Sequence, residues 1–307
     1  MATRPLGHSG IQVSVIGLGC NQFGGSVDLA GTREVIEAAI SHGITFLDTA
    51  DRYGNTRSEE LIGEVLRGRR NEVVLATKFG LDVGDGWDGP RGTPAYIRHA
   101  VENSLRRLQT DVIDLYWYHR PDGVTPIGET LAGLDEVVRA GKVRAIGASN
   151  FTLEQIRAAD LVAVERGLTR FTAIQNEYNL LHREPERDVL PLCEELELAF
   201  VPYYPLAAGL LTGKYRRDQA APAGARLSQR DQIATEEQWR LVEALRDYAA
   251  QRNRPLTDVA IGALLTQPAV ASVITGATRA SQLASNASAA AWKPSDADLQ
   301  ALRATLE

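Results

Sequence analysis

The chain has 307 residues, with 33 Lys and Arg residues against 39 Asp and Glu residues, so its formal net charge is −6. This balance argues against a nucleic-acid-binding protein, which needs a basic surface to displace counterions, so no nucleic-acid partner is predicted. Hydrophobic residues make up 44% of the chain and charged residues 23%, as in folded globular proteins, which excludes wholesale disorder. The two cysteines, Cys20 and Cys193, are too few for a disulfide framework.

Neither the opening segment nor a long uncharged stretch near residue 268 predicts a membrane or secretory protein. The opening MATRPLGHSG contains Arg4 but no apolar run behind it, so no secretory signal is expected and a cytoplasmic location is the default prediction. Residues 259–278 carry no charge over a length that could span a bilayer. Thr266, Gln267 and Pro268 interrupt this stretch, and proline removes a helix hydrogen bond. It therefore predicts a buried helix, a turn and a buried strand, and no membrane partner.

Taken in chain order, short β-branched runs alternate with amphipathic stretches. Residues 3–6 and 12–14, around His8-Ser9-Gly10, predict a β-hairpin that could plug one face of the fold. Amphipathic helices such as 33–42 and 126–140 lie between the strands that follow. Eight such strands are predicted, at 15–19, 45–48, 73–78, 112–118, 143–148, 172–175, 199–203 and 271–275.

Eight βα units form either a closed (β/α)8 barrel or an open doubly wound sheet. The open sheet needs G-x-G-x-x-G after its first strand, whereas residues 17–22 read GLGCNQ. A formal match at 84–89, GDGWDG, is interleaved with aspartates and followed by Pro90, which does not suit a pyrophosphate loop. We therefore predict an α/β fold of the TIM-barrel type, as a single domain over 1–307. The long loop 210–232 after the seventh strand is expected to be functional or mobile.

Polar residues lie at the carboxyl ends of three consecutive predicted strands. In a barrel of this type, catalytic residues are found at that end of the strands. These residues are Asp48, Lys78 and His119, with Tyr53 five residues beyond Asp48. A phenol titrates near ~10, and a neighbouring ammonium lowers that pKa, so Lys78 is expected to tune Tyr53 while Asp48 holds Lys78. His119 would donate a hydrogen bond to a polarised carbonyl oxygen. Each residue alone also fits a cap, a packing contact or a solvated charge, but the four together favour general-acid catalysis during hydride transfer.

The same residues lie in runs that resemble the aldo-keto reductase superfamily. Residues 46–54, FLDTADRYG, with Ser58-Glu59 and Gly63 behind them, look like its signature. The 209–215 run is most similar to bacterial members and to potassium-channel β subunits. Further similar runs are 76–78 (ATK), 114–121 (DLYWYHRP), 141–151 (GKVRAIGASNF), 175–179 (QNEYN), 203–206 (YYPL), 209–215 (GLLTGKY) and 276–279 (GATR), so the resemblance spans nearly the whole chain.

This resemblance implies an NADP(H)-dependent barrel enzyme that reduces a small-molecule aldehyde or ketone to an alcohol, or runs the reverse reaction. Tyr53 would be the general acid, Lys78 and Asp48 would adjust its pKa, and His119 would orient the substrate carbonyl. Ser149, Asn150 and Gln175 would bind the nicotinamide amide, with Tyr203 stacked on its ring. Residues 204–209 and Lys214 would line the pyrophosphate, and Gly276 with the helix at 278–286, whose N-terminal amides can meet phosphate, would hold the adenosine end. In chain order the implied cofactor residues are Gly19, Cys20, Asp48, Ser149, Asn150, Gln175, Tyr203, Tyr204, Pro205, Leu206, Ala207, Gly209, Lys214, Gly276, Thr278, Arg279, Gln282 and Asn286.

Two departures from the family pattern bear on specificity. Gly276 stands where many members carry a Lys, so the 2′-phosphate contact would fall on Arg279, whose planar fork suits it. Asn21 stands where many members carry a Trp, and the more polar pocket mouth predicts hydroxylated substrates such as sugars. Trp87, in the loop after the third strand, is a second candidate for the substrate pocket, or else an exposed loop aromatic.

Three alternatives differ in function. The first is a nucleotide-binding redox-sensing module with slow turnover, and the second is an alcohol or sugar dehydrogenase working mainly in the oxidative direction. The third is an isomerase or lyase on phosphorylated sugars, for which Tyr204-Pro205-Leu206 is a poor phosphate loop because proline lacks the amide hydrogen. No metal site and no particular oligomeric state are predicted, since the remaining histidines share no ligand spacing: His8, His42, His99 and His182.

Overall fold

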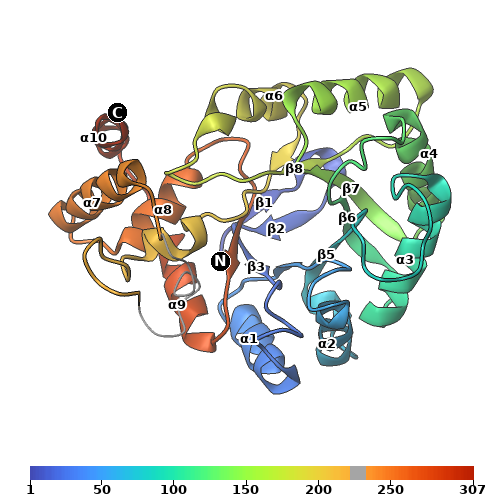
Figure 1. Cartoon of the computed structure of the whole chain (residues 1–307), viewed down its shortest axis with the longest axis horizontal. Helices are drawn as coiled ribbons and strands as arrows, with labels where there is room; N and C mark the ends of the chain where they lie inside the picture. The colour runs from blue at the N-terminus through green and yellow to red at the C-terminus, as the bar shows by residue number, and fades with distance from the viewer. Residues whose placement is uncertain (222–232) are drawn as a thin grey trace.

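A parallel eight-stranded barrel forms the centre of the computed structural model, which describes residues 1–221 and 233–307 (Figure 1). Its two edge strands meet because the amide of Ile274 donates to the carbonyl of Pro202 at 3.1 Å and that of Ala271 to Phe200 at 3.0 Å. The predicted (β/α)8 barrel is confirmed. Around the sheet the strands are β10 (Val273–Gly276), β3 (Ile16–Gly19), β4 (Phe46–Asp48), β5 (Val74–Phe79), β6 (Ile113–Tyr118), β7 (Val143–Ser149), β8 (Ala173–Gln175) and β9 (Ala199–Phe200).

Helices cover the outside of the barrel and begin where local capping predicts. The Thr93 hydroxyl accepts the Tyr96 amide hydrogen at the start of α3, and Thr152 forms a capping box with Gln155 at the start of α5. The covering helices are α1 (Leu29–Ser41), α2 (Arg57–Val65), α3 (Pro94–Leu108), α4 (Ile127–Arg139), α5 (Leu153–Arg166), α6 (Val189–Glu195), α8 (Leu256–Leu264) and α9 (Ala280–Ala289). Short 3-10 turns occur at Gly7–Ser9, Arg70–Glu72, Glu184–Glu186 and Ala207–Thr212.

The uncharged stretch 259–278 folds as predicted, into the end of α8, a turn and strand β10. Within residues 1–221 and 233–307, no helix has both the length and the apolar character needed to cross a bilayer. Of the predicted loop 210–232, residues 222–232 lie outside the described part of the chain.

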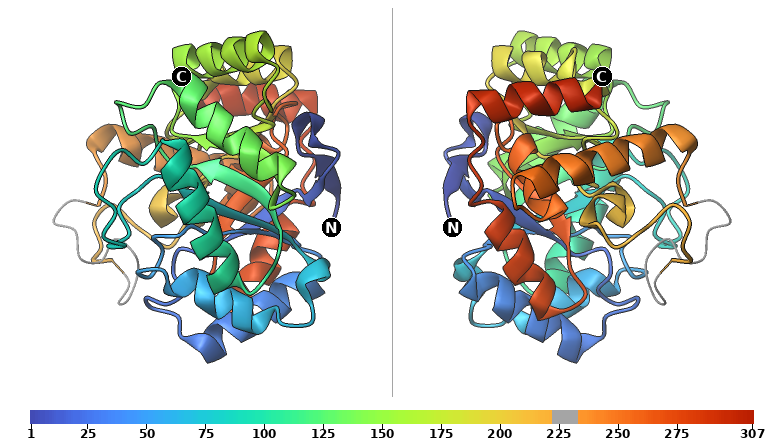
Figure 2. Two further views of the ribbon diagram at one scale, coloured as in Figure 1. Left: turned by 90° about the vertical axis from the view of Figure 1, so that its right-hand side faces the viewer. Right: turned by 90° about the vertical axis from the view of Figure 1, so that its left-hand side faces the viewer.

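The N-terminal hairpin closes one end of the barrel, as predicted. Strand β1 (Thr3–Pro5) pairs antiparallel with β2 (Gln12–Ser14), and the buried side chains of Leu6 and Val13 pack with Phe46 and Trp117 inside the barrel. In Figure 2 the hairpin and the loop after β5 lie on opposite sides of the molecule. The hairpin therefore leaves the carboxyl ends of the strands open.

Two helices outside the ring were not distinguished in the sequence. Helix α7 (Glu236–Gln251) packs against α10 (Asp296–Leu306), away from the barrel strands (Figure 1). The Tyr248 hydroxyl donates to the carbonyl of Asp298 at 2.8 Å, and the Arg252 guanidinium donates to the Asp298 carboxylate at 2.8 Å. These contacts join two segments separated by strand β10 and helix α9.

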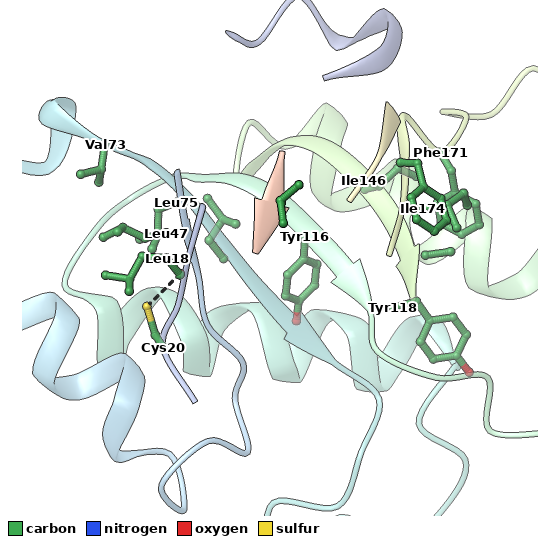
Figure 3. Packing of buried hydrophobic residues seen from close by; sticks show 14 of the residues in the cluster. Leu18, Cys20, Leu47, Val73, Leu75, Tyr116, Tyr118, Ile146, Phe171 and Ile174 are labelled. Atoms are coloured by element: carbon green, nitrogen blue, oxygen red, sulfur yellow. Dashed lines mark hydrogen bonds between the residues drawn. The ribbon is translucent and has the colours of Figure 1, made fainter. Parts of the chain in front are cut away.

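The core has an inner and an outer layer because neighbouring residues of a strand point to opposite faces. On β6, Leu115 and Trp117 lie inside the barrel, whereas Tyr116 and Tyr118 belong to the outer layer between strands and helices. Figure 3 shows part of this outer layer, with Leu18, Leu47 and Leu75 gathered on adjacent strands. The alternation decides which polar residues reach the barrel interior.

Candidate active site

Strand alternation brings the candidate catalytic residues together at the open end of the barrel. On β4, Asp48 follows the inward Phe46 by two residues, and on β5, Lys78 follows the inward Ala76 by two. Their side chains meet, with 2.6 Å between Lys78 Nζ and Asp48 Oδ2. Only 1% of the Lys78 side chain and 4% of the Asp48 side chain are exposed. This is a buried ion pair, which is stable only when its remaining polar atoms are satisfied.

All the hydrogen-bonding capacity of the Lys78 ammonium is used. It donates to Asp48, to the carbonyl of Thr49 at 2.8 Å and to the Tyr53 hydroxyl at 3.3 Å. Burial lowers the pKa of Lys78, but the attraction of Asp48 and Tyr53 outweighs burial, and the pKa lies above its ordinary value. Lys78 therefore stays charged beside the phenol.

Two further donors hold the other oxygen of Asp48. Trp117 Nε1 donates to Oδ1 at 3.0 Å and Gln175 Nε2 donates to the same atom at 3.2 Å. Trp117 was not predicted to belong to the site. Strand alternation points it into the barrel, and the register of β5 and β6 places it opposite Lys78. The sequence signal that could have identified it is its position two residues after the inward Leu115 on the same strand. Gln175, expected at the nicotinamide, is here bonded to Asp48.

A tight turn carries Tyr53 to the lysine. The three residues after Tyr53 are all left-handed, with φ of 57° at Gly54, 53° at Asn55 and 73° at Thr56. A Cβ at Gly54 would lie 2.5 Å from the carbonyl oxygen of Phe23, so only glycine fits there. Left-handed backbone is rare for a β-branched residue such as Thr56, and such strain concentrates at functional sites.

The expected lowering of the Tyr53 pKa is wrong in its net direction. Burial raises this pKa, the Lys78 charge lowers it and the Asp48 charge raises it, and the balance lies above the ordinary value for a phenol. Lys78 thus acts with the expected sign, but desolvation is the larger effect. The phenol keeps its proton at neutral pH, which is the state that a general acid requires.

The His119 ring faces Tyr53 edge to face, with 6.0 Å between the ring centroids. Burial, followed by the charges of Lys78, Arg52 and Arg120, lowers the pKa of His119 to about 2. The imidazole is therefore neutral, with one N–H donor and one acceptor nitrogen. Its Nδ1 is buried and has no hydrogen-bond partner among the described residues. An unpaired buried polar atom of this kind suits contact with a ligand.

The residues implied at the nicotinamide form one hydrogen-bonded chain. Asn150, left-handed with φ of 60°, donates from Nδ2 to the His119 carbonyl and to Ser149 Oγ, both at 3.0 Å. The Tyr203 hydroxyl donates to Asn150 Oδ1 at 2.8 Å. Cys20, which directly follows β3, is fully buried, and burial raises the pKa of its thiol, so Cys20 is packed rather than reactive.

The segment implied at the pyrophosphate has unusual backbone geometry. Between 204 and 209, four residues are left-handed: Tyr204, Ala207, Ala208 and Gly209, with φ of 54°, 45°, 55° and 106°. Pro205 and Leu206 lie within the same turn, which leads through the 3-10 turn at Ala207–Thr212 to Lys214. Burial and the positive charge of Arg279 lower the pKa of Lys214. Two like charges from distant parts of the chain thus lie near each other, and a phosphate would relieve their repulsion.

The adenosine end differs in one respect from what was expected. The amides of Thr278 and Arg279, at the start of α9, already donate to Gln282 Oε1 at 2.7 and 3.1 Å. Two of the amides expected to meet phosphate, those of Thr278 and Arg279 just before Ala280, are therefore occupied by the Gln282 side chain. Asn286 is buried and its Nδ2 has no partner among the described residues, and open space surrounds Gly276. The unpartnered amide and the Lys214–Arg279 cations fit a dinucleotide.

The two residues suggested for the substrate pocket are placed differently. Asn21 lies two residues beyond Gly19, the end of β3, at the open end of the barrel, and is half-buried. The Trp87 ring packs against Tyr96 and His99 of α3, with centroid separations of 5.2 and 5.4 Å. These ring contacts are on the helix side of the loop, so they give no support to Trp87 as a pocket wall.

Comparison with known proteins agrees with this geometry. A family model described as the aldo/keto reductase family matches residues 15–307. The chain is similar to "Aldo-keto reductase YhdN" of Bacillus subtilis, with 42% identity over 70% of this chain and 65% of that relative, just under two thirds of its length. It is also similar to "Uncharacterized oxidoreductase YqkF" of the same organism, with 36% identity over 99% of this chain and 96% of the relative. With its barrel and strand-end residues, the chain belongs to the aldo/keto reductase family, whose members are oxidoreductases acting on carbonyl compounds.

Proposed function

We propose that residues 1–307 form one catalytic barrel, an NADP(H)-dependent enzyme that reduces an aldehyde or ketone with Tyr53 as the general acid. The observation that carries this proposal is the Lys78 ammonium, 2.6 Å from Asp48 and 3.3 Å from the Tyr53 hydroxyl at the open end of the barrel. A charge at that position stabilises the phenolate that forms as the proton leaves.

The overall reaction converts a carbonyl, a hydride and a proton into an alcohol. The hydride to carbon would come from the nicotinamide cofactor when it is bound. Tyr53 supplies the proton to oxygen, as its raised pKa keeps it protonated at neutral pH. Neutral His119 donates one N–H to the carbonyl oxygen and so orients it, and Asp48, held by Trp117 and Gln175, keeps Lys78 in place.

The cofactor is proposed to lie along the strand ends from β7 to α9. Ser149 and Asn150 would meet the nicotinamide amide, and Tyr203 would stack on its ring. Lys214 and Arg279 would bind phosphates, because their mutual repulsion favours an anion between them. Arg279 is also proposed to bind the 2′-phosphate, which supports a preference for NADP(H) over NAD(H).

The test is NADPH oxidation with an activated aromatic aldehyde, and NADP+ reduction with the matching alcohol, for the wild type and Tyr53→Phe. We expect Tyr53→Phe to abolish turnover in both directions and to leave nucleotide affinity, measured by calorimetry, within about twofold, since only a proton donor is lost. Tyr248→Phe, on the outer helix α7, is the matched control and should retain wild-type turnover. Nucleotide binding lost together with turnover in Tyr53→Phe would mean that the tyrosine is structural.

A further inference from the structure

Two arginines border the opening in which Tyr53 and His119 face each other. Arg52 directly precedes Tyr53, and Arg120 directly follows His119. Both are exposed, and within the described chain neither side chain has a hydrogen bond or an ion pair. Because the Tyr53 and His119 rings lie 6.0 Å apart, edge to face, the two arginines belong to one rim.

The positive charge of this rim reaches the reacting groups. Burial is the largest cause of the lowered His119 pKa, and the charges of Lys78, Arg52 and Arg120 lower it further. Arg120 also lowers the pKa of Tyr203, against the larger effect of burial. The Lys78 charge is compensated by its ion pair with Asp48, whereas the two arginines have no such partner.

Nearby carboxylates do not neutralise the rim. Asp51, the residue next to Arg52, is only 1% exposed, and burial, with the Glu59 charge, raises the pKa of its carboxyl well above the usual range. Asp122 accepts the amides of Gly92, Val124 and Thr125, and its carboxylate is turned into the loops. The charge of Glu177 raises the pKa of Tyr203, but among the described residues Glu177 forms no ion pair with Arg52 or Arg120.

We propose that the substrate carries an anionic group, a carboxylate or a phosphate, a few atoms from its reacting carbonyl, and that Arg52 and Arg120 bind it. This inference rests on the proposed function and narrows its substrate class. Guanidinium groups match the planar geometry of carboxylate and phosphate oxygens and bind them in pairs of hydrogen bonds. In a chain of net charge −6, a local positive rim also steers anions toward the opening.

The test compares aldehydes that carry an anionic group with neutral partners, which have nearly the same shape in the first pair and lack the phosphate in the second. One pair is 4-carboxybenzaldehyde against 4-formylbenzamide, and the other is glyceraldehyde 3-phosphate against glyceraldehyde. The quantity measured is the ratio of kcat/KM for the anion to that for its neutral partner. We expect the wild type to favour at least one anion about tenfold, with the preference falling as salt rises, and Arg52→Gln and Arg120→Gln each to cut the ratio about tenfold. Arg240→Gln, an exposed arginine on α7, should leave the ratio unchanged.

The corresponding ratio of binding affinities is measured by calorimetry with the matching alcohols and NADP+, in the Tyr53→Phe background, so that it does not depend on turnover. A ratio near one in both pairs, or a ratio that both glutamine variants leave unchanged, overturns the anion site. Turnover of neutral aldehydes with no anion preference overturns this inference alone. Absence of turnover with every carbonyl and alcohol overturns the proposed function instead, and the calorimetric ratio then still decides the anion site.

Discussion

Two buried ion pairs lie on opposite sides of strand β5, and only one of them can do chemistry. Lys78 points inward to Asp48, while the preceding Thr77 points outward, where its hydroxyl donates to Glu59 at 2.5 Å. Glu59, on α2, is paired with Arg107 of α3 at 2.6 Å and is fully buried. Both pairs hold charges in the low-dielectric interior, and the adjacent residues Thr77 and Lys78 of β5 connect the strand to one pair each.

The difference lies in what surrounds each pair. The inner pair contacts the Tyr53 phenol, which carries an exchangeable proton and faces the open end of the barrel. The outer pair is enclosed between the strands and helices α2 and α3. Near it, Asp51 Oδ1 and the Tyr116 hydroxyl are buried without partners among the described residues. A buried ion pair therefore marks a catalytic site only where a proton donor and access to a ligand accompany it.

Removing the inner cation should have the largest effect on activity. Lys78→Met takes away the charge that stabilises the Tyr53 phenolate, so we expect turnover to fall by about 10²- to 10⁴-fold. Without that charge the pKa of Tyr53 rises further. In the reductive direction, which needs the protonated phenol, the alkaline limb of the pH profile should move to higher pH. A pH–rate profile from pH 6 to 11 measures both, and an alkaline limb that moves to lower pH would contradict the assignment.

Breaking the outer pair should cost stability without a comparable loss of activity. Arg107→Leu leaves the Glu59 carboxylate buried without its cation, which typically destabilises a protein by about 3–5 kcal/mol. Urea unfolding measures the loss, and Arg106→Leu, its exposed neighbour, should stay within about 0.5 kcal/mol of the wild type. We expect kcat per folded molecule to change less than twofold. A fall in kcat as large as that of Lys78→Met would place the outer pair in the catalytic machinery.

The smallest effects should separate two adjacent aromatic residues of β6. Trp117→Phe removes one donor to Asp48, and losing a hydrogen bond to a charged group costs about 1.5–3 kcal/mol of stability. With one donor fewer, the Asp48 charge raises the pKa of Tyr53 more strongly. The alkaline limb of the pH–rate profile should therefore move to higher pH, as for Lys78→Met, but by less. Tyr116→Phe, on the outer face, removes a hydroxyl without a partner and should change stability by no more than about 0.5 kcal/mol. Equal behaviour of the two variants would contradict the role of Trp117.

Much of the fold could be predicted because it depends on local pattern. The alternation of β-branched runs and amphipathic helices reflects the two periodicities of backbone structure, so all eight strands and the plugging hairpin were found near their observed bounds. The inward direction of Asp48 and Lys78 follows from the same period of two. Helices α7 and α10 were not recognised as an outer pair, because their contact joins segments far apart in the chain.

By itself, the sequence of this protein determined its strand order, the faces of those strands and the polar residues that close them, since each depends on neighbours along the chain. Only the tertiary structure decided the hydrogen bonds of Asp48 with Trp117 and Gln175, 69 and 127 residues away. It also decided the net pKa of Tyr53 and the capping of the α9 amides by Gln282. These properties depend on burial and on distances in space, because electrostatic and desolvation energies are set by the final positions of groups rather than by their order in the chain.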